Sequence, residues 1–216
     1  MPIITGIVPS TEQPGYVVIL VDGAPFATVP EQSVSRLGLA EGGVAGELLS
    51  PPDGPEQRTY ERALSLLSFQ ARSSRELQKS LIEKGEPAGS VAKVIARLEA
   101  SGLLDDARFA EGRARAGIVG KTRSRWRIKQ DLAQRGVTGE VADEAIRRVF
   151  AEEDTDETRV AERAARKKLR TLSGLPAPAQ RAKLYGFLAR QGYTPDVVRR
   201  VMLSVLDATP PDGSDE

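Results

Sequence analysis

The sequence predicts a mainly α-helical fold, in which three tandem three-helix repeats of the helix-turn-helix type form an elongated array after a small β-rich cap. The main observation is a nine-residue pattern that occurs three times, at residues 77–85, 128–136 and 184–192. Each copy has apolar residues four positions apart and then a glycine where a helix would end. The glycines lie 51 and then 56 residues apart, and a period near fifty indicates stacked supersecondary units. The second observation is that the first fifty residues are instead rich in β-branched residues.

The N-terminal extension, residues 1–49, is expected to form the β-rich cap. Asp22-Gly23 is a strong hairpin-turn signal. Pro30 suits the first turn of a short helix, and Gly38 suits its end. Runs rich in β-branched or aromatic residues predict strands at residues 3–8, 16–21 and 26–29.

A linker and then the first helical repeat follow the cap. Residues 50–58 are expected to be the linker, because Ser50–Pro55 contains three prolines and a glycine. The first repeat is expected at residues 59–106, with a second helix that begins at a capping box of Ser73 and Glu76 and ends at Gly85. The residues expected to face the core from its other two helices are Tyr60, Ala63, Leu64, Leu67, Val91, Val94, Ile95 and Leu98.

The second repeat is expected at residues 107–154 and the third at residues 155–207. The predicted helices include 125–135 in the second repeat, 160–169 and 182–191 in the third, and a last helix that starts at Thr194-Pro195-Asp196. The residues expected on the inner faces of the flanking helices are Phe109, Ala110, Arg113, Ala114, Val141, Ala145, Ile146, Val149, Val197, Val201 and Val205. Residues 208–216 are expected to be a disordered acidic tail.

The composition excludes several kinds of site. The chain has no cysteine and no histidine, so thiolate zinc sites, cysteine nucleophiles and the usual general base are absent. We see no nucleophile–base pair, phosphate loop or converging ligand set, and we predict no enzymatic activity, no cofactor and no metal. Asp105 and Asp106 are interpreted as caps of a helix that begins near Ala107, rather than as metal ligands. Without an 18-residue apolar stretch or a signal-peptide pattern, the chain is expected to be cytoplasmic and to have no membrane contact.

The charges are distributed unevenly along the chain. Residues 1–58 carry 2 basic and 7 acidic side chains, whereas residues 59–207 carry 29 basic and 20 acidic ones. A basic middle part suggests a polyanionic partner. Residues 121–129 are the densest acid-free run and predict a phosphate-contact surface, with the amides at a helix start adding to the attraction; a solvated helix face is the alternative. We call its basic side chains the basic stripe: Lys121, Arg123, Arg125, Arg127 and Lys129.

A second group of cations lies in the third repeat, where Arg163, Lys167 and Arg170 would share one helical face. For this face, a binding site and a solvated surface are equally supported. Trp126 could stack on a nucleic-acid base, but packing against the helices is favoured because no set of aromatic residues accompanies it.

The junction of the first two repeats carries the most specific motif. Residues 102–110 read Gly-Leu-Leu-Asp-Asp-Ala-Arg-Phe-Ala, and residues 74–77 read Ser-Arg-Glu-Leu. With the run 127–136, these residues resemble the RecX family of bacterial regulators of the RecA recombinase, over about residues 59–207. The chain departs from the family at Thr122-Arg123-Ser124, where a Gly-Pro pair is common, and at Trp126, where a basic residue is common.

The resemblance implies a non-enzymatic protein that binds in the groove of the RecA–DNA filament and inhibits ATP hydrolysis and strand exchange. It thereby implies a role in homologous recombination, DNA repair and the SOS response. The implied partners are the RecA filament, single-stranded DNA and duplex DNA, and we expect a monomer. The alternative is a tandem helix-turn-helix regulator of transcription that binds DNA, because three-helix units with basic second helices also fit that class.

Overall fold

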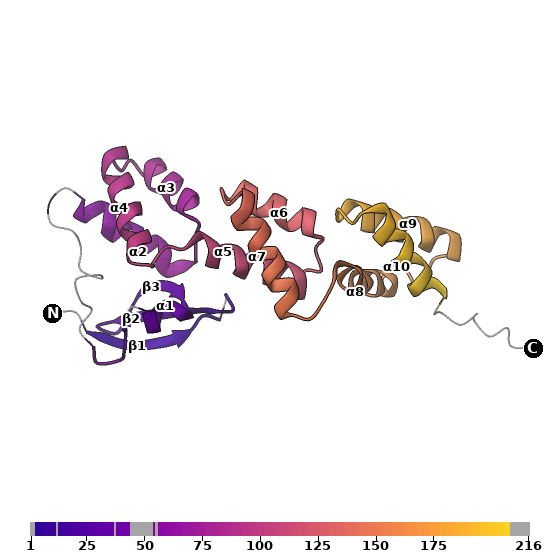
Figure 1. The fold of residues 1–216 in the computed structure, drawn as a ribbon, viewed down its shortest axis with the longest axis horizontal. Helices are drawn as coiled ribbons and strands as arrows, with labels where there is room; N and C mark the ends of the chain where they lie inside the picture. Colours follow the sequence, from indigo (N-terminus) through magenta and orange to yellow (C-terminus); the bar gives the residue numbers. More distant parts are fainter. Residues whose placement is uncertain (1–2, 12, 37, 44–53, 55, 208–216) are drawn as a thin grey trace, which may run out of the picture. The chain divides into compact units, whose positions relative to one another are not determined.

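The computed structural model describes residues 3–11, 13–36, 38–43, 54 and 56–207, and within them the chain forms three strands and ten α-helices (Figure 1). The described residues form two compact units. The first contains the residues up to Gly112 and the segment Gln134–Val137, and the second contains Arg113–Ala133 and the residues from Thr138 onward. The predicted mainly helical fold with an N-terminal β part is confirmed. Residues 50–53 of the predicted linker and the predicted tail 208–216 lie outside the described residues.

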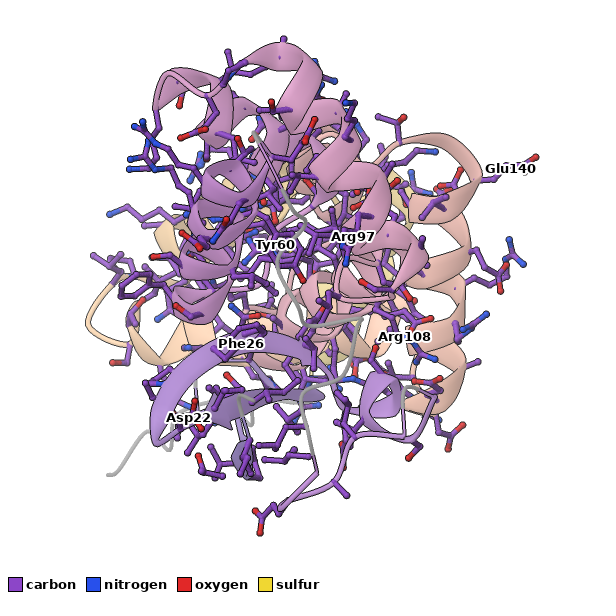
Figure 2. The ribbon with its side chains drawn as sticks, turned by 90° about the vertical axis from the view of Figure 1, so that its left-hand side faces the viewer. Asp22, Phe26, Tyr60, Arg97, Arg108 and Glu140 are labelled. Carbon is purple, nitrogen blue, oxygen red and sulfur yellow. The ribbon has the colours of Figure 1, made fainter. Side chains whose placement is uncertain are left out.

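An antiparallel sheet forms the N-terminal part of the first unit. Its strands are β1 (Ile4–Pro9), β2 (Tyr16–Val21) and β3 (Ala24–Pro30), with β2 in the centre. Asp22 and Gly23, at the hairpin turn (Figure 2), have φ angles of 50° and 82°. Two consecutive positive φ values are what a two-residue hairpin turn needs, so the predicted hairpin is confirmed. The short helix α1 (Glu31–Arg36) follows β3 directly.

The first repeat consists of α2 (Gln57–Phe69), α3 (Ser74–Glu83) and α4 (Ala88–Ala100). Helix α2 packs against β3, and the apolar residues of the sheet and of the repeat form one continuous core. The predicted core residues of α2 and α4 are all buried except Ile95, which is partly buried. Figure 2 shows Tyr60 and Arg97 together, with the guanidinium carbon 5.7 Å from the ring centroid. Burial raises the pKa of Tyr60.

The second repeat consists of α5 (Asp106–Arg115), a π-helical turn η1 (Ala116–Gly120), α6 (Arg125–Gln134) and α7 (Gly139–Glu152). The π-helical turn was not predicted. The expectation that Val141 faces the core is wrong, because 43% of it is exposed. Ala142 is buried instead, since the inner face of α7 runs through positions 142, 145, 146, 149 and 150 and Val141 lies one step off it.

The third repeat consists of α8 (Glu157–Arg170), α9 (Ala177–Arg190) and α10 (Pro195–Asp207). Helix α9 begins five residues before the predicted start at 182, because Pro176 precedes it and Pro178 lies in its first turn, where a missing N–H costs nothing. Ala161, Ala164 and Ala165 of α8 pack against Leu184, Leu188 and the valines of α10 in one core.

A set of hydrogen bonds at the start of α6 joins the second and third repeats inside the second unit. The Ser124 hydroxyl accepts a hydrogen bond from the backbone N–H of Arg127 at 3.1 Å and donates one to the carbonyl of Gln191, after α9, at 2.7 Å. The Glu157 carboxylate, from the first turn of α8, accepts the backbone N–H of Arg125 at 2.8 Å. We call these contacts the serine clasp.

Gly192 completes the serine clasp through close packing. Its φ is +83°, and a Cβ atom placed there would lie 2.5 Å from Cε3 of the Trp126 indole and 2.9 Å from the Ser124 hydroxyl. The indole therefore lies directly on the glycine, as the packing interpretation of Trp126 predicted, although 53% of the residue stays exposed. The Tyr193 hydroxyl donates to the carbonyl of Thr122 at 2.6 Å and strengthens the same junction.

The first unit contains the same clasp. The Ser73 hydroxyl accepts the backbone N–H of Glu76 at 3.1 Å and donates to the carbonyl of Arg135, and the Asp106 carboxylate accepts the N–H of Ser74 at 2.7 Å. The groups that correspond between the two clasps are Ser73 and Ser124, Asp106 and Glu157, Arg135 and Gln191, Gly136 and Gly192, and Arg75 and Trp126. The capping box predicted for Ser73 and Glu76 is confirmed.

The two adjacent aspartates have different roles. The Asp105 carboxylate accepts the N–H of Arg108 at 3.0 Å and caps α5, as predicted. The expectation that Asp106 caps the same helix is wrong, because its carboxylate turns to the N-terminus of α3 through Ser74. Burial raises the pKa of Asp106, although the hydrogen bond from Ser74 opposes the effect.

Replacing Gly192 with alanine tests the serine clasp. An L-residue at φ +83° is strained and its Cβ would meet the Trp126 ring, so the free energy of unfolding should fall by roughly 1–3 kcal/mol. Urea denaturation followed by circular dichroism measures this change. Gly174→Ala is the control, because its Cβ would meet nothing within 4 Å and its φ is outside the left-handed region. If Gly192→Ala and Gly174→Ala unfolded at the same urea concentration, the clasp would add no stability.

Candidate nucleic-acid interface

Helix α6 carries most of the basic stripe on its outer surface. Ile128 and Leu132 anchor its inner side and are 2% and 0% exposed. Ile128 packs on Gly117 of η1, where a Cβ atom would lie 2.8 Å from Cγ1 of Ile128. Because the inner side is fixed in this way, Arg125, Arg127 and Lys129 stay exposed.

Acidic and aromatic groups from elsewhere in the second unit meet three members of the stripe. Lys129 pairs with Asp143 of α7 at 2.7 Å, and Nη1 of Arg123 lies 3.8 Å from the Asp131 carboxylate. The Arg125 guanidinium lies over the Phe150 ring, 4.0 Å from its centroid. Residues 121–129 contain no acidic residue, but in the folded chain the carboxylates of Asp131 and Asp143 lie beside the stripe. Arg123 and Lys129 are partly neutralised by their carboxylate partners, whereas Arg125 keeps its charge but is held over the ring.

The start of α6 is not open to an anion, and the expected contribution of its backbone amides is wrong. The Glu157 carboxylate already accepts the Arg125 N–H, and the Ser124 hydroxyl accepts the Arg127 N–H. Both acceptors belong to the serine clasp, so a phosphate would have to displace structural contacts to reach these amides.

Lys121 and Arg127 are the members of the stripe whose charges are unpaired within the described residues. Both are exposed, and neither side chain makes a hydrogen bond or ion pair there. Lys121 follows η1, and Arg127 lies in the first turn of α6. In the part of the chain that the structure describes, these two cations are the members of the stripe best suited to bind phosphate.

The cations of α8 form a second exposed face. Lys167 and Arg170 are exposed, and their side chains make no hydrogen bond or ion pair with another described residue. Arg163 is also exposed, but its Nη2 donates to the carbonyl of Ile118 at 3.2 Å and so holds η1 against α8. Lys168 instead lies over the Phe187 ring, 5.7 Å from its centroid. Two of the three predicted cations on this face are therefore available to a partner.

Neither a metal site nor a membrane span is found in the described part of the chain. No group of three or more aspartate and glutamate side chains converges there. None of the helices there has the length and apolar character needed to cross a bilayer.

Three models of protein domains match this chain, one on each repeat. They are described as the first, second and third three-helix domains of RecX, and they match residues 60–98, 105–146 and 155–202.

Curated proteins similar to this chain are named regulatory protein RecX. The protein of Chlorobaculum tepidum is 32% identical over 154 residues, which cover 71% of this chain and 92% of the relative. The protein of Halorhodospira halophila is 34% identical over 152 residues, which cover 70% of this chain and 90% of the relative. The protein of Levilactobacillus brevis is 29% identical over 214 residues, which cover 97% of this chain and 78% of the relative.

Solved structures show the same fold. A crystal structure of regulatory protein RecX has a TM-score of 0.59 and 23% identity, covering 93% of this chain and 98% of that one. The crystal structure of RecX from Lactobacillus salivarius has a TM-score of 0.59 and 19% identity, and the match covers 69% of this chain and 96% of that one. At these identities the likeness shows a common fold alone.

The stripe and the core beneath it should respond differently to substitution. Ile128→Ala should lower the free energy of unfolding by roughly 2–5 kcal/mol, because it leaves a cavity at a fully buried site. The double variant Lys121→Glu/Arg127→Glu should stay within about 0.5 kcal/mol of the original chain, because both side chains are exposed and unpaired. Chemical denaturation measures both. A large loss in the double variant would mean that these cations support the fold.

Proposed function

The chain belongs to the RecX family, and we propose that it binds the RecA–DNA filament and damps its ATP hydrolysis and strand exchange. It is a non-enzymatic regulatory protein of that family. The observation that carries the proposal is the match of its three repeats, in order, to the three RecX domains. As part of this proposal, the protein acts in the cytoplasm, where the bacterial chromosome and its recombination filaments lie.

The basic stripe supplies the contact with DNA phosphates in this proposal. Lys121 and Arg127 can contact phosphates without giving up an internal partner. Arg123, Arg125 and Lys129 join them at the cost of their contacts with Asp131, Phe150 and Asp143. Lys167 and Arg170 of α8 extend the surface. Every neutralised phosphate releases counterions, so affinity for the filament should fall steeply with salt.

The geometry disfavours a sequence-reading regulator of transcription. In a helix-turn-helix protein, the N-terminal residues of a recognition helix contact base edges. The start of α6 is covered by Glu157 and Gln191. The first half of α7 has no basic residue: it exposes Glu140, and its Asp143 and Glu144 pair with Lys129 and Arg147. Neither helix therefore offers an open, basic N-terminus to a major groove, and backbone contacts fit the surface better.

The DNA-dependent ATPase of RecA tests the proposed function. RecA on circular single-stranded DNA should hydrolyse ATP more slowly as the protein is added. Lys121→Glu/Arg127→Glu should need roughly tenfold more protein for the same effect, which corresponds to about 1.4 kcal/mol of lost contact energy.

The matched control is Lys183→Glu/Arg190→Glu, which makes the same charge change on exposed positions of α9 outside the stripe. It should inhibit as the original chain does. An ATPase rate unaffected by the original chain would overturn the function, whereas equal inhibition by both double variants would overturn only the role of the stripe.

A further inference from the structure

Between α9 and α10, the last two helices in Figure 1, residues of the third repeat line an open groove with a volume of about 640 Å³. Most of the residues that line the groove are apolar, and the other two are arginines. Tyr185 and Leu203 face it from opposite helices and are 54% and 55% exposed, so two large apolar side chains lie together at one exposed site. The lining residues are Pro178, Arg181, Ala182, Tyr185, Pro195, Arg199, Met202 and Leu203.

At the corresponding position, each of the two preceding repeats has a long side chain that packs on the repeat that follows. Counting back from the shared glycines, Ala182 corresponds to Trp126 in the second repeat and to Arg75 in the first. Those two long side chains lie on Gly192 and Gly136 in the serine clasps. Tyr185 and Arg199 correspond to Lys129 and Asp143, which pair at 2.7 Å. In the third repeat a methyl group and an aromatic ring stand at these positions, and no further repeat among the described residues packs on Ala182.

We propose that this groove binds an acidic segment of a partner protein that inserts a bulky apolar side chain between Tyr185 and Leu203. This site is distinct from the basic stripe, and the proposal does not depend on the action on RecA. A protein segment is favoured over nucleic acid because six of the eight lining residues are apolar. Such a lining buries an apolar anchor but offers few donors to a phosphate backbone.

The charges of the groove select an acidic ligand. No acidic residue lines it, and the Arg181 side chain makes no hydrogen bond or ion pair with any described residue. Arg199 has only an exposed contact with Asp196 at 3.6 Å, in which both side chains are more than 70% exposed. The chain's own acidic residues 208–216 contain no large apolar side chain, so they lack the anchor that the groove would bury.

A random 12-residue peptide library displayed on phage, selected on the full-length chain, tests the proposal. Counter-selection uses the double variant Tyr185→Ser/Leu203→Ser, which alters only exposed side chains and should fold. Enriched peptides should carry several acidic residues next to Leu, Phe, Trp or Met. The absence of enrichment over the double variant, or enrichment of peptides without acids, would overturn the proposal.

Fluorescence anisotropy with the most enriched peptide, labelled with fluorescein, locates the site. Leu203→Ser and Arg181→Glu should each weaken binding about tenfold. Matched controls are Val119→Ser, an apolar residue that is 54% exposed outside the groove, and Lys183→Glu, a cation on α9 that does not line it. Both controls should change the affinity less than twofold. Equal losses in the controls and the groove variants would refute the assignment.

Three further measurements identify other occupants, and each positive result would overturn the proposal. A tenfold gain in peptide affinity on removal of residues 208–216 would make the chain's own tail the occupant. If sedimentation velocity showed a dimer that Leu203→Ser dissociates, the occupant of the groove would be a second copy of this chain. If Tyr185→Ser lowered the affinity for a 20-nucleotide oligo(dT) as much as the affinity for the peptide, the groove would be a nucleic-acid site.

Discussion

The buried hydroxyl group of Ser124 links the start of α6 to the third repeat through one oxygen atom. It caps α6 by accepting the Arg127 N–H and holds the third repeat by donating to the Gln191 carbonyl. A buried hydroxyl without partners would be costly, so this side chain favours the arrangement in which both bonds form. The arrangement then requires glycine at 192, because the Trp126 ring occupies the space of a side chain. In the first unit the Arg75 side chain, beside Ser73, imposes the same requirement at Gly136.

This constraint also determines what the basic surface can bind. The clasp uses the amides at the start of α6, so anion binding there depends on side chains rather than on the helix terminus. The internal partners of Arg123, Arg125 and Lys129 reduce the net attraction further. What remains is a modest, adaptable cationic surface. Such a surface suits a regulator that must engage a polymer wherever it forms, because phosphate contacts position a protein without reading sequence.

The sequence contains the signals for the helices, since the recurring glycines, the capping box at Ser73 and the Asp22-Gly23 turn are all local features. It does not reveal contacts between distant residues. Ser124 and Gln191 are 67 positions apart, and Arg125 and Glu157 are 32 apart. This separation explains why the role of Asp106 and the closed start of α6 were not predicted. The neutralisation of the stripe depends on how α6 folds against α7, which brings Asp143 to Lys129. One signal was available: Asp105-Asp106 recurs as Asp156-Glu157 at the repeat spacing, with the second acid capping the helix of the preceding repeat.

The central claim is that this chain recognises the assembled RecA filament rather than a DNA sequence. Equilibrium binding of the labelled protein to RecA-coated single-stranded DNA, to the same DNA without RecA and to a pool of random duplexes tests it most directly. The account predicts the tightest binding to the filament, little dependence on base sequence and a steep decrease with salt. Binding to the filament no tighter than to naked DNA, together with a preference of several orders of magnitude for one duplex sequence, would contradict it.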